Sequence, residues 1–253
     1  LANDLFDFEK GADTTGRLGP PRATQTGAAS PEQMRRATIL TFGAAALLGV
    51  SLLLVGGWPI LAIGLSCIVA GLTYTGGPWP TGYHGLGDAV CFLFFGLVAV
   101  AGSHYLQAQV LSPLAVAAAF PVACIVTAIL VVNNLRDLET DRRAGKRTLA
   151  VILGVTLSRV EYALLMLAPY PLVAALALTL PAPWSWLAWL TLPLAISLVR
   201  TVLGGAKGRD LTPILRRTAQ LRKLCLSLAK ARPAPASPAP APRDKSTAGG
   251  GSR

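Results

Sequence analysis

Six apolar runs alternate with polar segments along most of the chain. They cover residues 37–55, 59–75, 88–106, 113–132, 160–180 and 184–203. Each is close to the length of about 20 residues that an α-helix needs to cross a bilayer. The turns at 56–59 and 181–183 are tight and contain Gly or Pro, so we expect their neighbouring spans to form antiparallel hairpins. The pattern predicts an all-α, polytopic transmembrane helical bundle with about six complete spans.

The two ends of the chain are more polar than its middle. Ser30, Pro31 and Gln33 resemble an N-cap, a first helical residue and the end of a capping box, and they predict where the first span begins. Near the other end, residues 211–230 form a basic, weakly amphipathic segment that we expect to lie on the membrane surface. The Pro/Ala/Gly-rich residues that follow predict disorder. We therefore divide the chain into a membrane domain, 1–220, and a basic surface helix with a disordered tail, 221–253.

The positive charge is distributed in blocks. The chain carries a formal charge of +11 and 23 Lys and Arg residues, of which five lie in 1–36, six in 133–159 and twelve from Arg200 onward. Short loops rich in Lys and Arg face the cytoplasm. This predicts a multi-pass protein of the cell membrane with those segments on the cytoplasmic side. The basic residues are not interleaved with aromatic ones, so we expect the lipid bilayer as a partner and no nucleic acid.

The four cysteines do not indicate a metal site or a disulfide framework. Cys67, Cys91, Cys124 and Cys225 are far apart, and the first three fall inside apolar runs. None forms a C-x-x-C pair or a Cys/His spacing typical of zinc sites. We expect them to be buried small hydrophobic residues.

The strongest chemical pattern is NNLRDLETDRRAGKRTL at 133–149. Asp137 and Asp141 are four residues apart, so in a continued helix their Cβ atoms lie on one face at about 5–6 Å. Arg136, Lys146 and Arg147 are among the bases around them. Acidic and basic residues together suit a metal–polyphosphate complex, because Mg²⁺ takes few protein carboxylates and completes its shell with phosphate oxygens and water.

A second acidic cluster lies at the start of the chain, on the same predicted side of the membrane. It comprises Asn3, Asp4, Asp7 and Asp13. If the two clusters converge, they would form a mouth able to hold two or three Mg²⁺ ions. Arg22, Lys146 and Arg147 would then clamp a diphosphate, spreading the charge that develops as it leaves. A single Asp pair in a loop is commonly a solvated face, whereas two matching clusters favour a site.

Three segments resemble signatures of the UbiA-type intramembrane prenyltransferases. They read NDLFDFEKGAD at 3–13, YTGGPWPTGYHGLGD at 74–88 and NNLRDLETDRRAGKRTLAVILG at 133–154, and the likeness extends from residue 1 to about 221. The second and third favour the branch that uses 1,4-dihydroxy-2-naphthoate. The resemblance implies a Mg²⁺-dependent enzyme that joins this acceptor to the prenyl group of polyprenyl diphosphate. Diphosphate and CO₂ leave, and demethylmenaquinone forms.

The resemblance also implies roles for individual residues. Mg²⁺ is expected on the carboxylates Asp4, Asp7, Asp13, Asp137 and Asp141, and all but Asp13 are the expected catalytic residues. Asn3 and Asn134 would orient metal or phosphate oxygens, and Arg22, Lys146 and Arg147 would hold the phosphates. The segment 74–88 would cap the cavity, with Tyr74 and Tyr83, or Asp88, against the aromatic acceptor. His84 lies in the same cap, where it could assist a proton transfer. The alternative for this segment is a simple turn between two spans.

The chain departs from the nine spans of that family. It begins without Met, and the resemblance predicts a fragment that lacks the first span, most of the second and a convincing last one. Three alternatives stay open: a related enzyme for another acceptor, such as 4-hydroxybenzoate, homogentisate or haem; a transporter; and an inactive truncated product. A transporter is expected to carry ionisable groups near the middle of its spans, and the six apolar runs hold almost none there.

Overall fold

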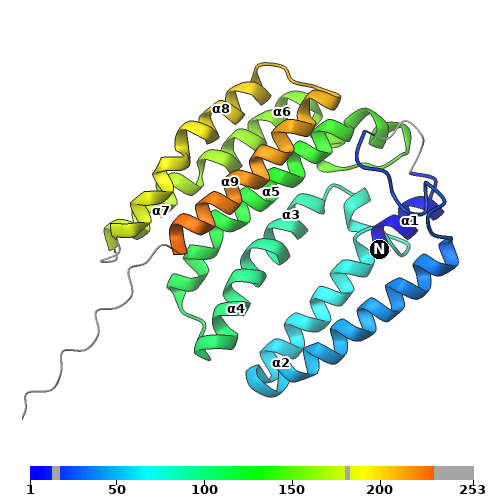
Figure 1. Ribbon diagram of the computed structural model, residues 1–253, viewed down its shortest axis with the longest axis horizontal. Helices are drawn as coiled ribbons and strands as arrows, with labels where there is room; N and C mark the ends of the chain where they lie inside the picture. Colours follow the sequence, from blue (N-terminus) through cyan, green and yellow to red (C-terminus); the bar gives the residue numbers. More distant parts are fainter. Residues whose placement is uncertain (13–17, 180–182, 231–253) are drawn as a thin grey trace, which may run out of the picture.

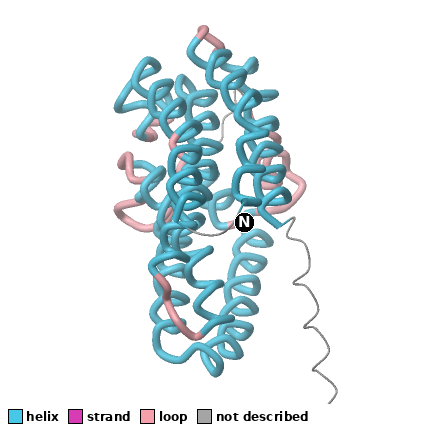
Figure 2. Tube along the Cα trace, turned by 90° about the vertical axis from the view of Figure 1, so that its left-hand side faces the viewer, coloured by secondary structure: helices cyan, strands magenta, loops and turns pink. Residues whose placement is uncertain are grey.

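The computed structural model describes residues 1–12, 18–179 and 183–230, and within these ranges the molecule is a bundle of helices with no strand (Figures 1 and 2). In chain order the elements are α1 (Ala2–Glu9), α2 (Pro31–Thr73), η1 (Thr81–Tyr83), α3 (Gly87–Cys91), η2 (Phe92–Val98), α4 (Ala99–Ala108), α5 (Pro113–Arg143), α6 (Leu149–Leu167), α7 (Pro169–Thr179), η3 (Pro183–Thr191), α8 (Leu192–Leu203), η4 (Gly208–Asp210) and α9 (Leu211–Lys230). Asp13 and the predicted disordered tail beyond residue 230 lie outside the described residues.

The first two predicted spans form one helical hairpin, α2. Its 43 residues are too many for a single bilayer crossing, and the chain reverses at Gly57, which has φ 65° and ψ −158° (Figure 1). Glycine suits this position because side chains disfavour positive φ. The Tyr105 hydroxyl of α4 donates to the Gly56 carbonyl at 3.1 Å and ties the turn to the next span. The predicted hairpin is confirmed.

The predicted start of α2 is also confirmed. Ser30 is the N-cap and Pro31 the first helical residue. The Ser30 N–H donates to Gln33 Oε1 at 2.8 Å, and the Gln33 N–H donates to Ser30 Oγ at 3.2 Å. These reciprocal bonds satisfy two backbone donors that a helix start leaves without partners.

The segment 133–159, expected as a polar loop, is mostly helical in the structure. Helix α5 continues to Arg143, and α6 begins at Leu149 after the N-cap Thr148. Only 144–148 separate the two helices. Carboxylates and arginines at the end of a span need not break the helix, because the polar end of the helix can leave the bilayer as α-helix. The helix therefore carries Asp137 and Asp141 as the spacing predicted.

Helix α5 is the centre of the bundle. Residues such as Ala128, Val131 and Val132 are buried on it, and α6, α8 and α9 pack around them with the apolar residues Met166, Ala195, Val202, Leu211 and Leu221. The Tyr162 hydroxyl lies 2.8 Å from Thr218 Oγ1, so α6 and α9 also share a buried polar contact. This half of the molecule forms one continuous core.

Helix α9 lies in the bundle and not at its surface, unlike the expectation from its composition. Leu211 and Leu221 are fully buried, although Arg216, Arg217 and Lys223 are exposed on the same helix. The apolar stripe of α9 is narrow, but it packs against α5 and α8. These contacts place the helix within the bundle. The domain boundary drawn at residue 220 falls within this helix.

Five helical segments are long and apolar enough to cross a membrane: Pro31–Thr73, Gly87–Ala108, Pro113–Arg143, Leu149–Leu178 and Trp186–Leu203. The first of these segments is the α2 hairpin, which contains two of the six predicted spans. Its leucines face outward, and Leu47 and Leu54 are 76% and 83% exposed. Such a surface is stable against lipid and costly in water. The protein is an integral membrane protein.

Candidate active site

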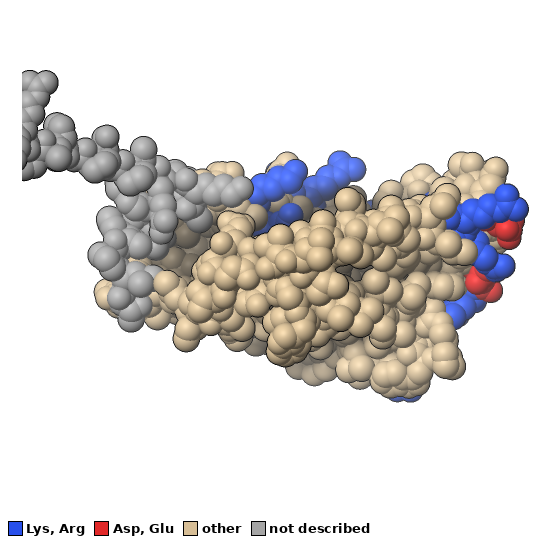
Figure 3. Space-filling model, turned by 90° about the horizontal axis from the view of Figure 1, so that it is seen from below, with Lys and Arg blue, Asp and Glu red and all other residues tan. Residues whose placement is uncertain are grey.

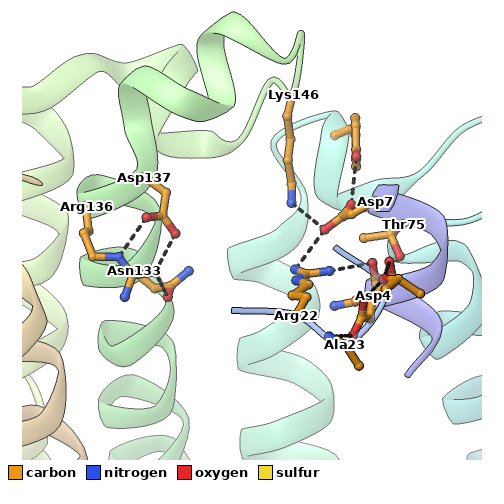
Figure 4. A network of polar contacts seen from close by, with 12 residues as sticks. Asp4, Asp7, Arg22, Ala23, Thr75, Asn133, Arg136, Asp137 and Lys146 are labelled. Atoms are coloured by element: carbon orange, nitrogen blue, oxygen red, sulfur yellow. Dashed lines mark hydrogen bonds and ion pairs between the residues drawn. The ribbon is translucent and has the colours of Figure 1, made fainter. Parts of the chain in front are cut away.

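Helix α1 and the strap at 22–24 hold the first acidic cluster at one end of the bundle (Figure 4). The Ala23 N–H donates to Asp4 Oδ2 at 3.1 Å, and the Thr24 hydroxyl donates to the other carboxylate oxygen. Arg22 Nη1 donates to the Asn3 carbonyl at 2.6 Å. These contacts fix Asp4 against the strap and bring Arg22 toward the rest of the site.

Asp7 is the most enclosed carboxylate of the site, at 2% exposure. Its Oδ2 lies 3.0 Å from Arg22 and 3.5 Å from Lys146 Nζ, and the Tyr83 hydroxyl donates to Oδ1 at 2.8 Å. A buried carboxylate requires such partners, because an unpaired buried charge is costly. Asp7 therefore links α1, the strap, the cap and the loop after α5, segments up to 139 residues apart.

The cap at 74–88 is attached to both acidic segments. Thr75 Oγ1 donates to Asn3 Oδ1 at 2.9 Å, and Lys10 Nζ donates to the Thr75 carbonyl at 2.6 Å. On the other side, His84 forms a parallel backbone bridge with Arg147. The cap thus does more than turn the chain, since it bridges the N-terminal segment and the loop between α5 and α6.

The second acidic cluster has a different environment (Figure 4). Arg136, only 3% exposed in its side chain, donates from Nε and Nη2 to the two oxygens of Asp137 at 2.7 and 2.6 Å. Its Nη2 also donates to Asn133 Oδ1 at 2.9 Å. The carboxylate of Asp137 is therefore already neutralised by a buried, bidentate partner, which the sequence spacing did not indicate.

Two cavities meet between these segments. A polar cavity of about 120 Å³ is lined by Arg22, Lys146, Asp88, Asn134 and Thr148 among others, and an apolar one of about 560 Å³ lies beside it. Four residues line both cavities: Asn3, Tyr74, Leu130 and Asn133. The remaining lining of the larger cavity is mainly aliphatic and aromatic, from α2, α3, η2, α5 and α9. The pair suits a molecule with an anionic head and a hydrocarbon tail.

Tyr74 stands at the junction of the two cavities. Burial raises the pKa of its hydroxyl most, and the carboxylates of Asp88, Asp7 and Asp141, together with the Cys91 thiol, raise it further. Carboxylates from both acidic clusters thus act on the same side chain. A raised pKa keeps the phenol neutral at ordinary pH, so Tyr74 remains a hydrogen-bond donor.

The donor atoms of the candidate metal ligands decide which ion they suit. All are carboxylate or amide oxygens, which suit Mg²⁺. Within the described residues, however, no three His, Cys, Asp or Glu side chains group closely enough to hold a metal ion by themselves. Asp7 is instead paired with two cations. The residues therefore fit Mg²⁺ only as part of a complex in which diphosphate supplies further oxygens.

The structure brings most predicted site residues together but not all. Those at or next to the polar cavity are Asn3, Asp4, Asp7, Arg22, Tyr74, Tyr83, Asn134 and Lys146. Arg147 is exposed, and neither Arg147 nor Asp137 lines either cavity. Asp141 is half-buried on the last turn of α5.

Sequence reasoning missed two polar side chains that line the polar cavity, those of Asn133 and Thr148. Asn133 is the first of an Asn-Asn pair directly after an apolar run, a visible signal because amides are costly inside a span. Thr148 is the N-cap of α6. Its capping role was readable from the sequence, but its position beside Lys146 in the cavity was not.

Comparison with known proteins places the chain among prenyltransferases. The model of the UbiA prenyltransferase family matches residues 1–218. The 1,4-dihydroxy-2-naphthoate octaprenyltransferase of Escherichia coli (strain K12) is 39% identical over 87% of this chain and 74% of its own length. The protein of the same name from Mycobacterium tuberculosis is 38% identical, over 86% and 73%. UbiA prenyltransferase domain-containing protein 1 of Danio rerio is 33% identical, over 88% and 65%.

Proposed function

Because the chain belongs to the UbiA prenyltransferase family, we propose that it transfers a polyprenyl group from polyprenyl diphosphate to 1,4-dihydroxy-2-naphthoate. The bond between the allylic carbon and the diphosphate oxygen breaks, and diphosphate leaves with the electron pair. A ring carbon of the acceptor then bonds to the allylic carbon. Loss of the acceptor's carboxylate as CO₂ restores aromaticity and gives the hydroquinone form of demethylmenaquinone, and a separate two-electron oxidation outside this enzyme's step converts it to the quinone.

One observation carries the proposal: a small cavity lined by Arg22 and Lys146 adjoins a larger apolar cavity, with which it shares four lining residues. This shape matches a diphosphate joined to a hydrocarbon chain. The two cations would bind the phosphate oxygens and stabilise the charge that grows on them as the bond breaks. The apolar cavity would bind the first part of the prenyl chain by burying it from water.

The carboxylates and amides are proposed to hold Mg²⁺ together with the diphosphate. Asp4, Asp7, Asp137 and Asp141 are the proposed ligands, and Asp13 is a further candidate. When bound, Mg²⁺ would neutralise the diphosphate and so assist its departure. Asp7 and Asp137 now have cationic partners, so binding of the complex requires Arg22, Lys146 and Arg136 to shift toward phosphate oxygens.

The neutral hydroxyl of Tyr74 lies where the two cavities join, so it is proposed to orient the acceptor by hydrogen bonding. Asn3, Asn134 and Tyr83 are proposed to position phosphate or acceptor oxygens around it. The acidic clusters and the cap all lie at the same end of the bundle (Figure 1). From the Lys and Arg distribution we propose that this end faces the cytoplasm and that the protein resides in the cell membrane.

The test is prenyl transfer in membranes that contain the full chain, with Mg²⁺, a polyprenyl diphosphate and labelled dihydroxynaphthoate. Lys146→Met removes a cation of the polar cavity, and Arg143→Met is the matched control, because Arg143 is exposed and lines neither cavity. We expect labelled product that disappears on chelation, falls at least tenfold in Lys146→Met and persists in Arg143→Met.

Three outcomes would contradict parts of the proposal. No product from membranes that contain the folded chain would refute prenyl transfer by this protein. Product formed from 4-hydroxybenzoate, but not from dihydroxynaphthoate, would refute the acceptor and leave the transfer reaction intact. Activity that survives chelation would contradict the role of Mg²⁺.

A further inference from the structure

Three cavities follow one another along a single stripe of α5. The polar cavity contacts Leu130, Asn133 and Asn134, and the 560 Å³ apolar cavity contacts Val126, Ile129, Leu130 and Asn133. A further apolar cavity of about 220 Å³ contacts Ala118, Pro121, Val122 and Ile125. The lining residues of α5 shift step by step from Asn134 toward Ala118, so the three cavities lie in a sequence that leads away from the polar end.

Arg222 of α9 stands at the junction of the two apolar cavities. It lines both, and among the described residues that line either one it is the only charged side chain. It lies near the middle of α9 and is half-buried. In Figure 3, basic side chains in the middle of the molecule stand amid uncharged surface, whereas those at the end that carries α1 stand beside acidic ones.

This position is unfavourable for a hydrocarbon chain. A prenyl tail gains free energy when it is buried against the aliphatic wall of the larger cavity. To continue into the smaller cavity it must pass the guanidinium and displace water from it, and removing water from a charge in apolar surroundings is costly. The next isoprene units therefore lose more than they gain at this point.

We propose that Arg222 limits the length of the prenyl chain that the enzyme accepts, by closing the path from the larger to the smaller apolar cavity. This proposal rests on the proposed prenyl transfer, with the diphosphate in the polar cavity. It makes Arg222 a residue that determines specificity and takes no part in the chemistry. The smaller cavity is then space that the wild-type protein does not use for its preferred substrate.

The chain offers a close control for charge and position. Lys223 is the next residue of α9, carries the same charge, is exposed and lines neither apolar cavity. Lys223→Leu therefore removes one positive charge from the same turn without altering the path. If donor specificity changes in Arg222→Leu but not in Lys223→Leu, the cause is the opened path between the two apolar cavities and not the lower net charge of α9.

The experiment is a competition assay on membranes that contain the full chain. An equimolar series of polyprenyl diphosphates from farnesyl to decaprenyl is supplied with limiting dihydroxynaphthoate, and products are separated by chain length. Product ratios report the relative kcat/KM of the donors. We expect Arg222→Leu to raise the ratio of long to short products about tenfold or more, and Lys223→Leu to leave it unchanged.

Three further variants keep the test decisive. Arg222→Met retains an unbranched side chain without the charge, so it replaces Arg222→Leu if that variant fails to fold, whereas Arg222→Lys should keep the wild-type ratio. Ala118→Phe fills the smaller cavity. It should leave the wild-type ratio unchanged and cancel the gain when combined with Arg222→Leu.

The outcomes separate the two proposals. If Arg222→Leu and Arg222→Met give active protein with the wild-type ratio, the role of Arg222 is refuted and prenyl transfer stands. If the ratio changes but Ala118→Phe does not reverse it, the path through the smaller cavity is refuted. If no donor gives product with wild-type protein, the proposed function fails and this inference fails with it.

Discussion

Replacing Asp137 by Asn should destabilise the protein through the arginine beside it. Arg136 is 3% exposed in its side chain and makes two bonds of 2.6–2.7 Å to the Asp137 carboxylate. Asn is nearly the same size, so packing is kept while the charge that neutralises the guanidinium is lost. A fall in activity alone would then not identify Asp137 as a metal ligand.

The contacts and burial of Arg136 and Asp137 determine how much stability the protein should lose. Removing one partner of a buried ion pair costs about 3–5 kcal/mol. Arg136 keeps its bond to Asn133 at 2.9 Å, and the Asp137 side chain is 12% exposed, so we expect the lower end, about 3 kcal/mol. For a chain of this size this corresponds to a fall of about 6–12 °C in the thermal midpoint.

A second variant separates stability from chemistry. Arg136→Met/Asp137→Asn removes both charges, and replacing a whole buried pair by groups of similar volume is often nearly neutral. We expect the double variant to recover most of the lost stability, to within about 1 kcal/mol of wild type. If Asp137 also holds Mg²⁺ with the diphosphate, prenyl transfer stays absent in this stable double variant.

The assay compares the thermal midpoints of wild type, Asp137→Asn, Arg136→Met and the double variant in one detergent, alongside prenyl transfer. A single variant that melts within about 2 °C of wild type would refute the stabilising role of the pair. If the double variant lost as much stability as the two single variants together, the energetic coupling between Arg136 and Asp137 would be refuted. Recovery of activity in the double variant would instead remove Asp137 from the proposed metal ligands.

Three further predictions concern the cap, the helix packing and pH. Tyr83→Phe deletes the hydrogen bond to buried Asp7 and should cost about 1.5–3 kcal/mol, measured as a lower thermal midpoint. Gly96→Ala would place its Cβ 2.2 Å from the Ala123 Cβ, so it should destabilise the packing of η2 on α5 by about 1–3 kcal/mol. Burial raises the pKa of Tyr74, so its ionisation lies above the usual value of about 10 and should cause no loss of activity up to that pH.

The predictions for Gly96 and Tyr74 each have a contrasting result. Gly43→Ala is the control for Gly96, because a Cβ there meets nothing within 4 Å and stability should not fall. An equal loss in both glycine variants would contradict close packing as the cause. For Tyr74, the rates of wild type and Tyr74→Phe should differ by a constant factor across pH. Convergence of the two profiles below pH 10 would show that the phenol ionises earlier than its burial allows.

The sequence determined the class of the protein and much of its secondary structure. Apolar runs of membrane-spanning length predicted the helices, and the capping residues at Ser30 predicted where α2 begins. The spacing of Asp137 and Asp141 predicted one helical face. These features depend on residues close in the chain, so local patterns contain the information. The resemblance of three short segments likewise gave the family, which the comparison confirmed.

Only the tertiary structure decided which partner each charge has. Asp7 meets Lys146 across 139 residues, while Asp137 is neutralised by its own neighbour Arg136. Arg136 stands next to Asp137 in the sequence, whereas the neighbours of Asp7 are Phe6 and Phe8, so the sequence offers Asp7 no adjacent charged partner. The same holds for α9, where composition predicted a surface helix but contact with α5 and α8 buries its apolar stripe and places Arg222 between two cavities. Burial and pairing depend on which distant segments meet, because the cost of an isolated charge is set by everything packed around it.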